Sequence, residues 1–291
     1  LLFLRSFLGG VAMDELNRKI QKLLDLFNAA NDEYINLIVA MLAVEYGEEV
    51  HVESMTTMLN RVDSITNTLK REAKTAIDDV VDTAFRLGYI SAQEELGDTS
   101  DISYSDTQQE MLDRIKKDTY NDMLTATNYM SESAKKFVRM KTSQVMQLEQ
   151  AMRQGQNQLA YSLARQLSEG KLSEDARIQG FTGIVDKAGR KWNLSTYAEM
   201  VIRTKTTQAH IYGTAEQAKE LGCNLFIISS HNAIDACKKW EGAIISVGES
   251  VEGYHSYEEL RETGEIWHPN CRHHITPVSN RVADRITANF H

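Results

Sequence analysis

Proline is absent from the first 268 residues of this 291-residue chain, whose two prolines are Pro269 and Pro277. Proline is the residue that most strongly interrupts a helix, so nothing in that stretch forbids helices of many turns. Its absence also excludes collagen-like and proline-rich linker structure. The sequence therefore favours long helices over most of its length.

The composition is that of a globular protein, with 42% hydrophobic and 25% charged residues. The length allows about two domains of ~150 residues each. Acidic residues outnumber basic ones by 41 to 32, which gives a formal net charge of −9. Because like charges repel, broad contact with nucleic-acid phosphates is disfavoured, and we expect no sequence-specific nucleic-acid binding.

The segment 1–12, LLFLRSFLGGVA, is apolar, but it is shorter than the about 20 residues that a membrane-spanning helix needs. It also lacks the basic residues that open a secretory signal. Gly9-Gly10-Val11 stands just before Met13, as an in-frame bacterial ribosome-binding sequence would encode. We therefore expect translation to start at Met13, with 1–12 as a non-native leader, and no membrane partner.

Apolar residues recur at steps of three and four from Met13 to about Tyr46, from Met55 to Leu87-Gly88, and from Met111 to Met152. This spacing predicts long helices with narrow apolar stripes, which favours a helical bundle. A further helix is expected to end near Gly170. The polar, turn-rich stretch 97–106 predicts a linker.

The pattern changes after Gly180. Residues 181–194 contain apolar residues on either side of a turn at 186–189, which predicts a β-hairpin. Ser195 or Thr196 is expected to cap a helix over 197–221 that ends at Gly222.

Short apolar runs at 224–230 and 242–248 predict strands. Ser256 and Glu259 have the spacing of a capping box and predict a short helix that stops at Gly264. The expected fold class is α+β, with a long-helix region over 13–178 and a small α+β domain over 179–291.

All three cysteines, Cys223, Cys237 and Cys271, lie in the C-terminal part. The odd number, without an export signal, argues against a disulfide scaffold. His268 and Cys271 have the two-residue gap of a zinc knuckle, and Cys237 follows a predicted strand that would bring it close to them.

These three residues supply three of the four ligands that a structural Zn²⁺ requires. His231 is the favoured fourth ligand, and Asp235, His273 and His274 are the alternatives. His273 would point away from Cys271 if that segment were extended. The simpler interpretation is a packed group of small buried cysteines and surface histidines. A bound zinc ion would cross-link and stabilise a small domain that has few apolar residues to form a core.

Two catalytic interpretations are weaker. Cys237 or Cys271 beside a histidine and Asp235 would resemble a thiol nucleophile, but no Gly-rich oxyanion segment follows Cys271. No phosphate-binding, dinucleotide-binding or metalloprotease motif occurs either. The sequence therefore favours a protein that is not an enzyme.

Four segments taken together carry a family resemblance: GFTGIVDKAGRKWNLSTYAEMVIRTKTTQAH (180–210), LGCNLFIISSH (221–231), CKKWEG (237–242) and WHPNCRHHITP (267–277). In this order they resemble the phage minor capsid protein family and, more distantly, the Mu F-type head-morphogenesis proteins. The helical region resembles such proteins only in its general pattern.

The resemblance implies a low-copy virion component, made in the cytoplasm of a bacterial host and associated with the portal of a tailed-phage or prophage head. It implies a role in head assembly or DNA delivery, with the portal protein and other head proteins as partners. The helical region 13–178 would dock on the portal.

One departure from the family concerns the metal. Relatives often carry C-x-x-C before the W-x-G motif, whereas this chain has Ile234 at the first of those positions and only Cys237 at the second. A site with four cysteines, or with three cysteines and a histidine, therefore cannot form. If a metal binds, His231 or Asp235 must stand in; otherwise the site has decayed to a packed Cys/His cluster.

The alternative function is a phage-encoded enzyme or effector such as an ADP-ribosyltransferase. Arg203 and the pair Ser229-Ser230 occur in the order which that chemistry would use. No E-x-E or Q-x-E follows Ser230, and Arg203 falls in a predicted helix.

Overall fold

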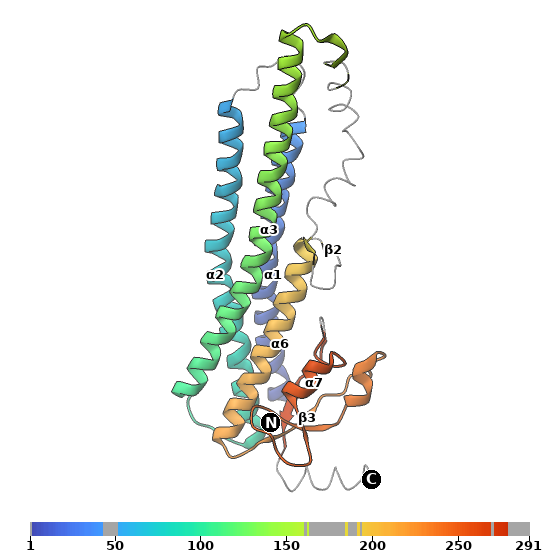
Figure 1. Ribbon diagram of the computed structural model, residues 1–291. Coiled ribbons are helices and arrows are strands. Elements are labelled where there is room, and N and C mark those ends of the chain that lie inside the picture. Colours follow the sequence, from blue (N-terminus) through green and yellow to red (C-terminus); the bar gives the residue numbers. More distant parts are fainter. Residues whose placement is uncertain are drawn as a thin grey trace. The chain divides into compact units, whose positions relative to one another are not determined.

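The computed structural model of the protein describes residues 2–42, 52–159, 162, 184–185, 191–192, 194–268 and 271–278. Four long helices and a small sheet make up most of these residues (Figure 1). The expected α+β fold class is confirmed. The helices are α1 (Leu2–Leu42), α2 (Val52–Leu96), α3 (Asp106–Arg153), α6 (Leu194–Glu220), the 3₁₀ helix η1 (Ala236–Trp240) and α7 (Tyr257–Thr263).

Two β-sheets are present among the described residues. The strands are β1 (Ile184–Val185), β2 (Lys191–Trp192), β3 (Leu225–Ile228), β4 (Ile244–Ser246), β5 (His255–Ser256) and β6 (Ile275–Pro277). The pair β1–β2 is antiparallel and confirms the predicted hairpin. The other sheet has the order β5-β4-β3-β6, in which β3 runs antiparallel to both neighbours and β5 runs parallel to β4.

The chain divides into two compact units, each made of separate segments. One unit contains residues 1–22, 75–121 and 199–291, and the other contains residues 23–74 and 122–198. The helices α1, α2 and α3 therefore each supply residues to both units. The predicted boundary between 178 and 179 lies outside the described residues, as do most of the helix expected up to Gly170 and the turn at 186–189.

In the unit of 23–74 and 122–198, buried hydroxyl groups join the three helices. Tyr34 Oη on α1 lies 2.7 Å from Thr66 Oγ1 on α2, which lies 3.0 Å from Ser131 Oγ on α3. Polar groups buried this way need partners, so these contacts fix how the helices pair. Lys135 Nζ pairs with Asp63 at 2.7 Å near the edge of the same core.

In the unit of 1–22, 75–121 and 199–291, two glycines let α2 and α6 pack closely. A Cβ atom on Gly88 would lie 2.1 Å from the carbonyl oxygen of His210, and one on Gly213 would lie 2.1 Å from that of Phe85. Real Cβ atoms do not approach so closely, so only glycine fits at either position. The prediction that α2 ends at Leu87-Gly88 was wrong: the helix continues to Leu96 because Gly88 serves packing and not termination.

The helix ends agree better with the sequence. Gly97 and Gly222 have left-handed φ angles of 76° and 78° and follow α2 and α6, in agreement with the predicted linker and stop. The N–H groups of Asp98 and Cys223 reach back to Gln93 O and Ala218 O at 2.9 and 2.8 Å, which completes a Schellman motif at each end. The predicted caps of α6 were wrong, because the helix begins at Leu194, before Ser195 and Thr196.

The four-stranded sheet packs its apolar side chains against α6 and α7. Phe226, Ile245 and Ile275 from the sheet are fully buried together with Ile211 of α6 and Leu260 of α7. No helix among the described residues is apolar over a length that could span a membrane.

Candidate metal centre

The sheet brings the segment after β3 next to the segment before β6. Because β3 and β6 are hydrogen-bonded neighbours, residues 229–237 lie at the same end of the sheet as His268 and residues 271–274. Ser229 N donates to His274 O at 2.9 Å, and His274 N donates to Ser229 Oγ at 3.0 Å. These bonds continue the strand pairing into both candidate ligand segments.

Local structure then places each sulfur. Asp235 caps η1 and accepts a hydrogen bond from Cys237 N at 3.1 Å, so Cys237 is held in the first turn of this 3₁₀ helix with its side chain buried. The N–H of Cys271 donates to His268 O at 2.9 Å and closes a tight turn. Pro269 lies outside the described residues.

Three of the four residues predicted as ligands come together. Cys237 Sγ lies 2.8 Å from His268 Nε2 and 3.7 Å from Cys271 Sγ. Cys237 is only 1% exposed, whereas Cys271 is partly buried. Burial raises the pKa of the Cys237 thiol, and the nearby Asp235 and Cys271 act in the same direction.

His273, one of the alternative ligands, joins this group. Its Nδ1 lies 3.2 Å from Cys271 Sγ, and its side chain is fully buried. The two side chains therefore lie on the same side. The expectation that an extended segment would turn them apart was wrong, because residues two positions apart in such a segment share a face. Trp267 takes a left-handed φ of 51°, and its indole N–H donates to the carbonyl oxygen of His273 at 3.2 Å.

His231 lies in an adjoining group instead. Its ring centroid is 4.2 Å from that of His273, and its ligand atom lies within 4.8 Å of those of Glu241 and His273. Among the described residues, the groups that could hold a metal are Cys237–Cys271–His273, Asp235–Cys237–His268 and His231–Glu241–His273. Cys237 and His273 are therefore each shared by two groups.

Glu241 is a functional candidate that the sequence analysis missed. Its Oε1 accepts hydrogen bonds from the backbone N–H of Ala233 and of His231 at 3.0 and 2.8 Å, and lies 3.4 Å from His273 Nε2. These bonds, the two from the backbone above all, hold the pKa of Glu241 at about 2. Its place in the CKKWEG segment was the only signal in the sequence.

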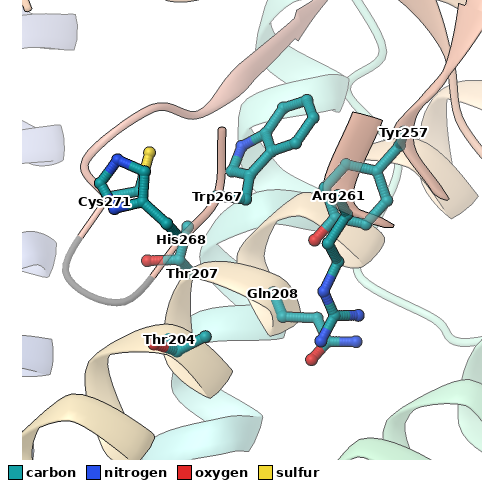
Figure 2. A pocket seen from close by; sticks show the side chains of 8 residues that line it. All are labelled: Thr204, Thr207, Gln208, Tyr257, Arg261, Trp267, His268 and Cys271. Carbon is teal, nitrogen blue, oxygen red and sulfur yellow. The ribbon is translucent and has the colours of Figure 1, made fainter. Parts of the chain in front are cut away.

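A crevice lies next to the cluster. Figure 2 shows its lining: Thr204, Thr207 and Gln208 from α6, Tyr257 and Arg261 from α7, and Trp267, His268 and Cys271 from the segment before β6. Its volume is about 10 Å³, which is space for about one water molecule. Two cysteines and two histidines beside so small a space are suited to holding an ion rather than a substrate.

The residues of the two catalytic interpretations have structural partners. Arg203 lies in α6 and pairs with Glu199 at 2.8 Å, and Ser229 is engaged by His274. A thiol nucleophile needs a lowered pKa, whereas burial raises that of Cys237. Neither the transferase nor the thiol interpretation gains support from this geometry.

Comparison with protein-family models gives one match, to the family described as phage minor capsid protein 2, over residues 11–287. No curated protein and no solved structure matches the chain. The matched range includes the helices, the sheet and the whole Cys/His cluster.

Proposed function

Because the chain belongs to the phage minor capsid protein 2 family, we propose that it is a low-copy virion component bound at the portal, acting in head assembly or DNA delivery. Membership of the family establishes the broader role: a structural protein of the phage particle whose partners are other head proteins. The match over residues 11–287 carries this conclusion.

Symmetry supports the portal as the binding place. A capsid shell repeats equivalent positions many times, so a protein present in few copies is expected at a vertex that occurs once. The formal charge of −9 fits contact with proteins better than with packaged DNA. Long helices such as α2 and α3 offer extended surfaces for such a contact.

Co-expression of the full chain with the portal protein of the same phage genome tests this proposal. We expect the two proteins to co-purify and to co-elute on size exclusion. The portal protein of an unrelated phage is the matched control. Binding to neither portal nor procapsid, or equal binding to both portals, would contradict the portal assignment.

We also propose that the Cys/His cluster holds a zinc ion that stabilises the C-terminal part of the chain. Cys237, His268 and Cys271 are the common ligands, and a histidine, His231 or His273, is the fourth. The carrying observation is that Cys237 Sγ contacts both His268 Nε2, at 2.8 Å, and Cys271 Sγ, at 3.7 Å. Metal analysis of full-length protein purified without chelators should find one zinc per chain, and a content near zero would end this proposal.

A further inference from the structure

The fourth ligand can be chosen by geometry. We propose that His273, held by Glu241, completes a zinc site with Cys237, Cys271 and His268, so that His231 is not a ligand. This inference rests on the proposal that the cluster binds zinc. It also adds a positioning residue, Glu241, that connects the metal to the loop after β3.

The spacing of Cys237, Cys271 and His273 is close to that of a tetrahedral ion. Zn–S bonds of about 2.3 Å and Zn–N bonds of about 2.0 Å at tetrahedral angles put two sulfurs about 3.8 Å apart and a sulfur and a nitrogen about 3.5 Å apart. His268 lies 2.8 Å from Cys237 Sγ and shares no candidate group with Cys271 or His273, so its ring must shift to join the same ion. The two sulfurs are 3.7 Å apart, and His273 Nδ1 is 3.2 Å from Cys271 Sγ. Cys237 Sγ also lies within 4.8 Å of His273 Nδ1 or Nε2.

His231 does not meet this condition. It falls into no candidate group with either cysteine, and its backbone N–H is bound to Glu241. Its ring packs against that of His273 instead. It is also exposed, whereas the proposed ligand His273 is fully buried.

The two ring nitrogens of His273 have different neighbours, which fixes its chemistry. Nε2 lies 3.4 Å from Glu241 Oε1, so the proton belongs there, and Nδ1 is left with a lone pair directed at the sulfurs. A carboxylate on the outer nitrogen of a metal-binding histidine sets its tautomer and raises its basicity.

The charges of the proposed site balance. Two thiolates neutralise Zn²⁺, and the two histidines bind as neutral ligands, so binding releases the two thiol protons to solvent. The backbone N–H groups of His231 and Ala233 donate to the same Glu241 carboxylate that orients His273. Loading of the ion should therefore order this loop as well as the cluster.

Zinc affinity of the full-length protein, measured by competition with a chromophoric chelator, tests the assignment. We expect His273→Ala to weaken binding at least 100-fold and Glu241→Gln to weaken it about 10–100-fold, as outer partners of metal ligands do. The matched control His231→Ala should change the zinc affinity by less than about 3-fold, because it removes a neighbour of His273 and no ligand of the ion.

A rescue variant separates ligation from folding. His273→Cys should restore binding, and the near-ultraviolet spectrum of its Co²⁺ form should show stronger sulfur-to-metal charge transfer than wild type, because three thiolates replace two. Failure of the wild type to bind zinc would refute the zinc proposal itself. Zinc binding that is lost in His231→Ala but kept in His273→Ala would refute this assignment alone. An unchanged affinity in Glu241→Gln would refute its positioning role.

Discussion

The sulfur of Cys237 lies 2.8 Å from Nε2 of His268, a residue 31 positions further along the chain. The contact joins the 3₁₀ turn after β3 to the turn before β6. These segments are also connected through the sheet, so the contact closes a loop that contains β4, β5 and α7. Its loss is expected to affect that whole region and not one side chain.

Replacing Cys237 by Ser should release zinc and loosen the C-terminal part of the chain, because metal affinity is then part of the folding free energy. If the cluster is only packed, the same change should cost no more than about 1–3 kcal/mol. Thermal unfolding with parallel metal analysis distinguishes these results. The control is Cys223→Ser. Cys223 is buried outside the cluster, where its sulfur lies 3.4 and 3.2 Å from the carbonyl oxygens of Leu225 and Val278. This variant should keep its zinc.

Acid should destabilise the cluster before it affects the carboxylates. Burial, with the nearby His231, lowers the pKa of His273, while Glu241 and Asp235 oppose this shift. Below the ordinary histidine pKa of about 6.5, this histidine takes up a proton in the unfolded chain but stays neutral in the folded one. The folding stability therefore falls as the pH drops through this range. Glu241, with a pKa of about 2, stays ionised throughout this range.

Urea unfolding of chelator-treated protein between pH 7.5 and 5 measures this effect. His273→Gln should reduce the pH dependence over that range without abolishing it, because burial also lowers the pKa of His210, to about 4, and that of His274. The control His255→Gln changes a histidine whose side chain is 65% exposed, and the pH dependence of this variant should be that of wild type. Equal slopes in all three proteins would remove His273 as the cause.

Gly88→Ala should destabilise the protein, although alanine is the better helix former by up to about 1 kcal/mol. The added methyl group would meet the backbone of α6, and overpacking of this kind costs about 1–3 kcal/mol. Gly213→Ala should behave alike, because it meets α2 from the other side. Glu95→Ala, at an exposed position of the same helix, serves as the control in a chemical unfolding series.

Limited proteolysis should cut first within 168–180, because LSEGKLSEDA is polar and rich in small residues. The other turn-rich stretch, 97–106, should resist, since Asp98 bonds to Gln93 and Ser100 at 2.9 and 3.0 Å. We expect the two fragments to remain together under native conditions through the contact of α2 with α6. Early cuts inside 197–221 would mean that the predicted boundary is wrong.

Local signals in the sequence predicted much of the fold. Ser256 and Glu259 form the expected capping box, with both reciprocal hydrogen bonds and Gly264 in the left-handed conformation. The short apolar runs 224–230 and 242–248 contain β3 and β4, which pair with each other as predicted strands do. In each case the residues that decide the structure are neighbours in the chain.

What the sequence did not predict depends on distant partners. From its local sequence alone, Gly88 is typical of a helix end. Its role becomes clear only from the contact with the backbone of α6, where a side chain would not fit. His273 faces the sulfurs because Trp267, six residues away, bends the chain and binds its carbonyl. Glu241 has no sequence neighbour that marks it, since its partners Ala233 and His231 precede it by eight and ten positions.

The unit of 1–22, 75–121 and 199–291 has a consequence for the inheritance of this gene. A crossover between residues 121 and 193 would place a foreign α6 against the resident α2. Such a hybrid is destabilised unless both partners bring glycine to the crossing, because Gly88 and Gly213 each meet the backbone of the opposite helix. Successful exchange should therefore transfer both helices together, and the gene should descend as a single block although its product has two compact parts.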